Sequence, residues 1–156
     1  MLRALACLAT AAIVLGLGAT RVGTSAALGC RPTPNDAAGP FQNLDAPRRA
    51  KIGTGHVLLG RVLRASDCRP VVGAVVFLWQ AGPNGYVYRP RGRASVVTNR
   101  SGRFRFEGPV PASSGFRPPH IHIAITHPAY EELLTRFVVR RGAKTGRMTI
   151  VLTPFL

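Results

Sequence analysis

The sequence predicts an all-β fold, an antiparallel β-sandwich with an extended N-terminal arm. Short apolar and β-branched runs recur after residue 55, Gly or Pro clusters separate many of them, and no segment keeps a helical period for long. Such spacing is typical of a sandwich or a flattened barrel. The predicted strands cover residues 57–63, 71–79, 95–98, 104–106, 120–126, 134–139 and 148–152.

Residues 1–27 are predicted to be a secretory signal peptide that precedes this fold. The stretch has a short basic start at Arg3, no further charge until Arg21, and small residues around Ser25 that suit cleavage. An uncleaved anchor is the alternative, because residues 4–20 are nearly long enough to cross a bilayer. Their glycines and small residues favour export. We therefore expect a secreted or envelope protein with no stable membrane span after cleavage.

Residues 28–54 are predicted to form the extended arm, and residues 55–156 the sandwich domain. The arm is rich in Pro, Asn, Asp and Ala and has few periodic apolar positions.

After signal cleavage two cysteines remain, Cys30 and Cys68, and an oxidising compartment would allow them to form a disulfide. The alternative is lipidation of Cys30, because residues 27–30 faintly resemble a bacterial lipobox. A lipobox usually has Leu three residues before the Cys, and its absence favours the disulfide.

Turn motifs and alternation define several elements of the predicted sandwich. Residues 67–70 are expected to turn the first hairpin, and residues 73–79 to form a strand buried on both faces. The turn at residues 99–102 leads into Arg-Phe-Arg-Phe at residues 103–106, whose two phenyl groups share the core face. Trp79 ends its strand, where it can belong to the core or form the wall of a site.

The formal charge of +15 suggests a nucleic-acid partner at first sight, because basic surfaces release counterions from phosphates. The basic residues are almost all arginines, however, scattered in ones and twos with no aromatic stripe between them. We therefore expect no nucleic-acid partner. A solvated basic surface that weakly binds acidic envelope polymers or anionic substrates is the simpler explanation.

His120 and His122 are the strongest candidates for chemistry. At positions i and i+2 of a strand, two imidazoles project from one face and can share a metal ion. If they are buried, both need polar partners, and a metal serves both at once. His56 and His127 are expected to be surface or hydrogen-bonded residues instead. Arg117 lies three residues before the pair, and the chain has only six acidic residues, which favours an anion-binding role over a structural salt bridge.

Several motifs occur along the chain in a fixed order, and the most specific is Arg-Pro-Pro-His-Ile-His at residues 117–122. The others are Cys-Arg-Pro-Thr-Pro at 30–34, Gly-Pro-Phe at 39–41, Gly-Arg-Val at 60–62, Cys-Arg-Pro-Val at 68–71, Gly-Ala at 73–74, Leu-Trp-Gln-Ala at 78–81 and the hairpin at 98–106. This order is seen in the intradiol ring-cleavage dioxygenases, and the mature chain resembles a small secreted member of that family along nearly its whole length.

The resemblance implies a non-haem Fe(III) site held by two tyrosines and two histidines. The histidines carry over onto His120 and His122, and Arg117 takes the position of the family's active-site arginine. Anionic phenolates stabilise the ferric state, and neutral imidazoles complete the ligand set. The implied substrates are a small catechol-type aromatic and O2, and the implied product is a ring-opened dicarboxylic acid of the muconate type.

The tyrosine positions match the family less well. One family tyrosine follows the Trp of the Trp-Gln strand by about eight residues, and Val87 stands at that place, flanked by Tyr86 and Tyr88. Either phenol could reach the metal after a one-residue shift of the loop. The second family tyrosine stands between two prolines, where this chain has Val110. Valine has no donor atom, so iron would be bound less tightly, through another group, or not at all. Nothing places Tyr130 at the metal.

A noncatalytic module is the alternative function. Sandwich domains of the transthyretin and carboxypeptidase-regulatory kind resemble the Gly-Arg-Val, Gly-Ala and Ser-Gly-Arg-Phe pattern without needing this metal. The fold alone does not separate the two functions. The histidine pair and Arg117 separate the two functions, because a noncatalytic module would not require them. The sequence leaves the oligomeric state and the particular catechol open.

Overall fold

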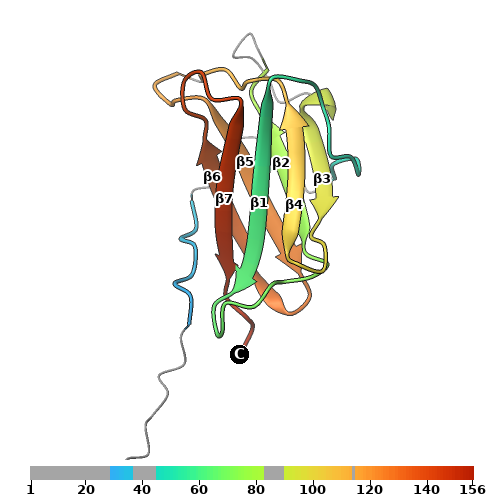
Figure 1. Cartoon of the computed structure of the whole chain (residues 1–156), viewed down its shortest axis with the longest axis vertical. Coiled ribbons are helices and arrows are strands. Elements are labelled where there is room, and N and C mark those ends of the chain that lie inside the picture. Colours follow the sequence, from blue (N-terminus) through green and yellow to red (C-terminus); the bar gives the residue numbers. More distant parts are fainter. Residues whose placement is uncertain (1–28, 37–44, 83–89, 114) are drawn as a thin grey trace, which may run out of the picture.

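The computed structural model describes residues 29–36, 45–82, 90–113 and 115–156, and within them it forms the predicted β-sandwich (Figure 1). The described part has seven strands and one short 3-10 helix, η1 (Pro90–Gly92). The strands are β1 (His56–Arg64), β2 (Val75–Gln80), β3 (Arg93–Val97), β4 (Arg103–Gly108), β5 (His120–His127), β6 (Tyr130–Val138) and β7 (Thr145–Leu152).

The strands form two sheets, with the order β4-β1-β7 in one and β3-β2-β5-β6 in the other. Figure 1 views the molecule with the three-stranded sheet in front. All strand pairs are antiparallel except β1 and β7, which run parallel. The predicted first turn is present, because Leu63 and Pro70 form an antiparallel bridge and Arg64 N–H donates to Arg69 O. The strand that follows, β2, lies in the other sheet, so β1 and β2 do not pair as a hairpin.

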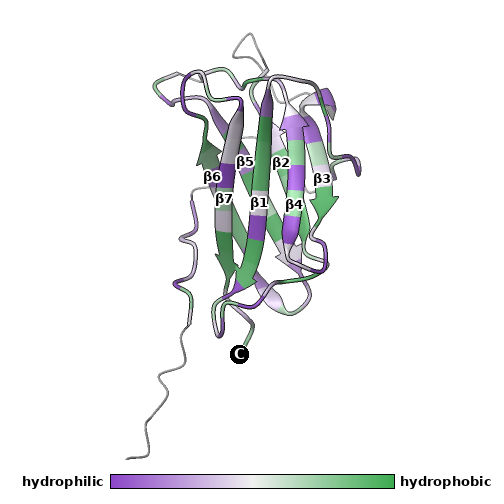
Figure 2. Ribbon diagram, in the orientation of Figure 1, coloured by the Kyte–Doolittle hydropathy of each residue, from purple (hydrophilic) through white to green (hydrophobic). Residues whose placement is uncertain are grey.

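The hydrophobic core lies between the sheets and comes from alternate residues of each strand. Phe104 and Phe106 of β4 both enter it, as their alternation with two arginines predicts. Figure 2 shows the same alternation as hydrophilic bands between hydrophobic ones on β4. The largest fully buried core side chains are Phe106, Leu58, Leu78, Ile121, Ile123, Ile125, Ile150, Leu152, Val62 and Val71.

The second strand begins later than the sequence predicts, at Val75 instead of residue 71. Gly73 has a φ of +80°, which takes the chain out of extended geometry just before the strand. The backbone N–H of Ala74 then donates to the hydroxyl of Thr98 at 2.9 Å. The strand is also less enclosed than expected, because Val75 and Phe77 are only partly buried while Val76, Leu78 and Trp79 are buried.

The arm is extended where the structure describes it, and it covers both open sides of the sandwich. Thr33 and Asp36 donate backbone hydrogen bonds to Val151 of β7 and Leu134 of β6, as the blue segment beside β6 in Figure 1 indicates. Residues 47–52 exchange backbone hydrogen bonds with Ser95 of β3 and Glu107 of β4. The arm therefore bridges the two sheets at each side and protects their edges from further pairing.

Gly60 is required by close packing in the core. It pairs with Phe104 across β1 and β4, and a Cβ at this position would lie 2.0 Å from the phenyl ring. We expect Gly60→Ala to lower the free energy of unfolding by about 1–3 kcal/mol, because the ring must leave its packed position. Gly92→Ala is the control, since its Cβ would meet only Gln80 O at 3.4 Å. Equal free energies of unfolding for the two variants, measured by urea denaturation, would contradict this packing.

Among the residues that the structure describes, no helix is long and apolar enough to span a membrane. The predicted signal peptide at residues 1–27 lies outside the described residues. The boundaries predicted for it, for the arm and for the sandwich domain stay predictions.

Candidate metal centre and adjoining pocket

His120 and His122 lie on the outer face of the four-stranded sheet, at the start of β5. Their neighbours Ile121 and Ile123 point the other way, into the core between the sheets. Alternation along the strand therefore sets both imidazoles on one face, as predicted. The two side chains are nevertheless buried, with exposed fractions of 3% and 5%.

The two imidazoles converge on one point. Their Nε2 atoms are 3.0 Å apart, and the rings meet edge to face. His120 Nδ1 is 2.7 Å from the carbonyl oxygen of Pro118. Because a carbonyl only accepts, the proton of His120 belongs on Nδ1, and its Nε2 presents a lone pair towards His122. A hydrogen bond of this kind, from the far nitrogen to a backbone carbonyl, orients histidines that bind metals.

Trp79 forms one wall of this site. It faces His122 across the β2–β5 ladder, and its indole stacks on the imidazole with ring centroids 5.1 Å apart. Both roles considered for Trp79 are thus present, since it is also buried with Ala81 and Ala124 in a second apolar cluster. Burial, reinforced by the charges of His120 and Arg117, lowers the pKa of His122 to about 4. His122 is therefore neutral at pH 7, the protonation state that a metal ligand needs.

A pocket of about 290 Å³ adjoins His120. Arg117, the predicted active-site arginine, lines it together with Phe116 and Arg136. Arg136 pairs with His122 across β5 and β6, and its Nε is 2.8 Å from Asp36 Oδ2. Asp36 also lines the pocket. Two guanidinium groups and one carboxylate leave a net positive charge, which suits an anionic ligand.

Arg136 was not among the residues singled out from the sequence, and Asp36 was considered there only as one of the six acidic residues. Arg136 reaches the site because the register of β5 and β6 sets it opposite His122. Asp36 reaches it because its backbone N–H donates to Leu134 O, which fixes the arm beside β6. Alternation along β6 could have placed Arg136 on one face, but no local signal gives the register between two strands.

The other two histidines are hydrogen-bonded residues, as expected, and Tyr130 lies at the other end of β6 from the site. His56 Nδ1 is hydrogen-bonded to Ala143 O at 2.8 Å, and His127 Nδ1 accepts from the backbone of Ala129. Tyr130 lies at the start of β6, whereas Val138 at the end of that strand faces His120.

The predicted phenolate ligands, Tyr86 and Tyr88, lie outside the described residues. Val110, which stands where the family has its second tyrosine, is half exposed. Its neighbour Pro109 accepts a hydrogen bond from the Gln80 side chain at 2.7 Å, and Gln80 pairs with Ile121 between the two histidines. The segment that contains Val110 thus reaches the end of the sheet where the imidazoles lie.

The donor set fits a metal ion only as part of a larger set. Two nitrogens 3.0 Å apart can each lie about 2.1 Å from one ion, and imidazole suits iron, copper and zinc alike. Within the residues described, no cluster of three or more His, Cys, Asp or Glu side chains could hold a metal. Further donors would therefore have to come from tyrosine, from substrate or solvent, or from outside the described part.

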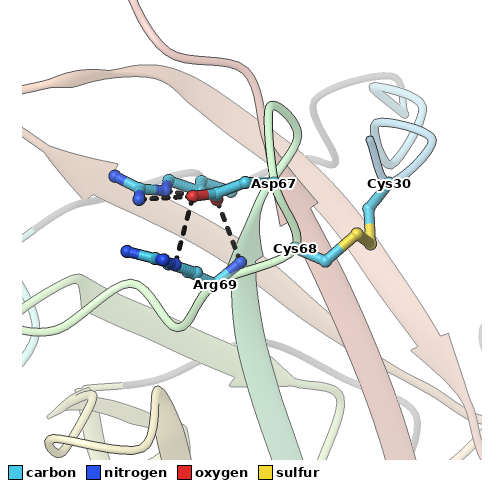
Figure 3. Close-up of a disulfide and its surroundings, with 5 residues drawn as sticks. Cys30, Asp67, Cys68 and Arg69 are labelled. Atoms are coloured by element: carbon cyan, nitrogen blue, oxygen red, sulfur yellow. Dashed lines mark hydrogen bonds and ion pairs between the residues drawn. A yellow bond between two sulfur atoms is a disulfide. The ribbon is translucent and has the colours of Figure 1, made fainter. Parts of the chain in front are cut away.

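The predicted disulfide between Cys30 and Cys68 is present (Figure 3). It joins residues 38 positions apart and ties the arm to the turn after β1. Next to it, Asp67 forms ion pairs with Arg64 and Arg69. The hydrogen bond from Arg64 lowers the pKa of Asp67. A bridged Cys30 is incompatible with the lipidated N-terminus that was the alternative.

The fold and the paired imidazoles define a β-sandwich protein with a candidate metal centre, and comparison with known proteins specifies the class further. The chain is 33% identical to a 6-chlorohydroxyquinol 1,2-dioxygenase of Cupriavidus pinatubonensis, in an alignment 139 positions long that covers 68% of this chain and 50% of the relative. It is 29% identical to the intradiol ring-cleavage dioxygenase prcA of Aspergillus niger, over 69% of this chain and 45% of that protein. No family model matches.

Solved structures with the same fold include the dioxygenase domain of a carbohydrate-binding fusion protein from Streptomyces sp. SirexAA-E. Its TM-score is 0.71 at 22% identity, over 80% of this chain and all of that one. An intradiol ring-cleavage dioxygenase from Tetranychus urticae has a TM-score of 0.68 at 18% identity, over 81% of this chain and 97% of that one. These relatives confirm the resemblance: the chain is a homologue of the intradiol ring-cleavage dioxygenases. It spans about half the length of the curated relatives it matches.

Proposed function

We propose that this chain is a non-haem Fe(III)-dependent intradiol ring-cleavage dioxygenase that acts on catechol-type aromatics with O2. The observation that supports this most is the convergence of the buried His120 and His122 Nε2 atoms beside a pocket that contains Arg117. The two Nε2 atoms are within hydrogen-bonding distance of each other, and a shared metal ion would replace that hydrogen bond by using both lone pairs.

His120 and His122 would hold the iron as neutral imidazoles, and Tyr88 or Tyr86 would supply a phenolate. Bound ferric iron would bind the two catechol oxygens and prepare the ring for O2. The chain itself orients these ligands. Pro118 fixes the tautomer of His120, and Trp79 holds the plane of the His122 ring. Both contacts would hold the rings in place before an ion binds.

Arg117 would bind substrate rather than metal. Its guanidinium lines the pocket beside His120, where a catechol oxygen or ring would carry negative charge. A fixed cation there lowers the energy of that charge without any rearrangement during the reaction. Phe116 lines the same pocket and offers an apolar surface for the aromatic ring.

Catalysis is tested by oxygen consumption. The Fe(III)-loaded protein is mixed with catechol, and O2 uptake is compared with the formation of a dicarboxylic ring-opened product. Intradiol cleavage breaks the bond between the two hydroxyl-bearing carbons and adds both oxygen atoms, so uptake and product should match one to one. Product formation that also occurs with Fe(III) and no protein would contradict the proposal, and so would oxygen uptake without ring opening.

Installing a tyrosine at position 110 is expected to strengthen ferric binding. Val110→Tyr supplies the donor that the family has at this place, on a segment held beside Gln80 and Ile121. A second phenolate stabilises Fe(III) and should intensify the visible absorption. Val72→Tyr is the control, because Val72 is 50% exposed against 49% for Val110 but precedes the start of β2, at the other end of the strand. Equal iron affinity and equal colour in both variants would show that residue 110 does not approach the metal.

Export of the chain is part of the same proposal. Residues 1–27 would direct secretion, and the Cys30–Cys68 disulfide supports an oxidising compartment. Residues 28–54 would then form the N-terminal arm of the mature protein, and residues 55–156 its catalytic domain.

A further inference from the structure

The outer face of the three-stranded sheet has an unusual concentration of arginine. Arg61 of β1 lies directly opposite Arg103 of β4, and Leu59 lies between Arg105 on one neighbouring strand and Arg147 on the other. All four arginines are exposed. Figure 2 shows hydrophilic bands on β7, β1 and β4, the three adjacent strands of the front sheet.

This arrangement is not what stability favours. Like charges that face each other across an antiparallel pair destabilise the sheet, and Arg61 and Arg103 occupy such a pair. Glu107 compensates part of this charge and is shared between Arg105 at 2.8 Å and Lys51 at 3.1 Å. The described arginines of this face outnumber that carboxylate, so the face is positive. A charged ligand that pairs with the arginines would relieve this repulsion.

The arginines line a continuous hollow. A depression of about 520 Å³ lies over β7, β1 and β4 and contains Arg61, Arg103, Arg105 and Arg147. A second depression, of about 370 Å³, shares Arg103 and Arg105 and extends to Arg48 on the arm. Neither is lined by an aspartate or a glutamate among the described residues. From β7 to the arm the hollow crosses three interstrand spacings, roughly 14 Å, which is longer than a single small anion.

We propose that this hollow, defined by Arg48, Arg61, Arg103, Arg105 and Arg147, binds a linear acidic polysaccharide across the strands. The repeating carboxylates of such a chain match a row of guanidinium groups, each of which can bind a carboxylate through two parallel hydrogen bonds. The site lies on the outer face of the three-stranded sheet, whereas the histidine pair lies on the outer face of the other sheet. The polymer would thus anchor the protein without blocking the candidate metal centre.

Two other polyanions fit less well. Single-stranded nucleic acid binds through aromatic side chains on which its bases stack. Among the described residues that line these hollows, the one aromatic, Phe104, is buried beneath the sheet surface. An anionic membrane is usually bound with protruding apolar side chains as well as cations. The exposed large apolar residues of the described part are Val72, Val110, Phe116, Val138, Phe155 and Leu156, and none of them lines the hollow.

The test is the binding of polygalacturonate, a linear polymer of uronic acids, to the full chain at low salt. We expect binding that weakens as salt rises, because exposed charges are screened. The double variant Arg61→Thr/Arg103→Thr should bind at least about tenfold more weakly, since it loses two charge-assisted contacts. Its melting temperature should stay the same or rise, because the facing like-charge pair is gone. A polymer whose carboxylates are methyl-esterified should not bind.

The control variant Arg31→Thr/Arg141→Thr removes the same charge from exposed positions outside the hollow. Its affinity for polygalacturonate should change by no more than about twofold if binding occurs in the hollow and does not follow net charge alone. Equal losses in the two double variants would overturn the proposal, as would no binding of polygalacturonate by the unmodified chain. If the chain binds single-stranded DNA or phosphatidylglycerol vesicles more tightly than polygalacturonate at equal charge concentration, the partner is that nucleic acid or membrane and not a polysaccharide.

Discussion

Replacing His120 and His122 together by alanine is expected to remove bound iron while the sandwich stays folded. Both side chains converge through Nε2 atoms 3.0 Å apart, and the described part has no group of three or more His, Cys, Asp or Glu residues that could hold a metal instead. Changing even a residue that orients a metal ligand typically costs 10–100-fold in affinity, so losing two ligands should lower affinity by at least that much. Iron is measured per chain after dialysis, and the fold is checked by circular dichroism.

Two further variants separate metal loss from damage to packing. His122→Phe keeps an aromatic ring against Trp79 but removes the nitrogen donor, so it should lose iron with little change in stability. His127→Ala changes a histidine whose Nδ1 only accepts a backbone hydrogen bond, and it should keep its iron. Iron content that is unchanged in the double alanine variant would exclude these histidines as ligands.

Removing the disulfide is expected to have the largest effect on stability. The bridge closes a loop across a sequence separation of 38, for which chain entropy predicts a contribution of roughly 4 kcal/mol. Cys30→Ser/Cys68→Ser should therefore unfold at much lower urea concentration. The arm should loosen first, because the cysteine pair holds it to the turn after β1 (Figure 3).

The reduced wild-type protein is the matched control for this cross-link. It should lose the same stability as the double serine variant, because both lack only the covalent bond. A difference of less than about 1 kcal/mol between oxidised and reduced protein would show that the bridge does not stabilise the fold. Peptide mapping without reductant should recover the two cysteine peptides linked together.

The strands could be predicted because their patterns are local. Arg103 to Phe106 alternates polar and apolar residues, and the structure places both phenyl groups in the core. The histidine pair was predictable for the same reason, since two residues at i and i+2 share a face whatever the strand pairs with. Trp79 could be expected beside the site because it ends its strand, and it stacks on His122.

The pairing between distant segments could not be predicted in this way. Nothing in β1 or β7 indicates that these strands run parallel, or that β1 and β2 belong to different sheets. Register is also non-local, and it alone sets Arg136 opposite His122 and Arg61 opposite Arg103. Both the charge of the pocket and the row of arginines on the other face emerge only once the strands are paired.

Val110 is where this chain departs most from the family it resembles. The segment around it keeps the two prolines and stays beside Gln80, yet the donor atom is missing. The proposed iron site therefore has one tyrosine from the loop after β2 and no second tyrosine at position 110. Ferric binding should consequently be weaker than in a site with both phenolates.

The visible absorption spectrum of the protein with Fe(III), recorded before and after catechol is added, tests the proposed iron site most directly. We expect a broad band from tyrosine phenolate to iron that shifts when catechol binds. The same band should be absent from the double alanine variant of His120 and His122. A colourless protein that catechol does not change would exclude a tyrosine-ligated ferric site and would favour a noncatalytic β-sandwich module.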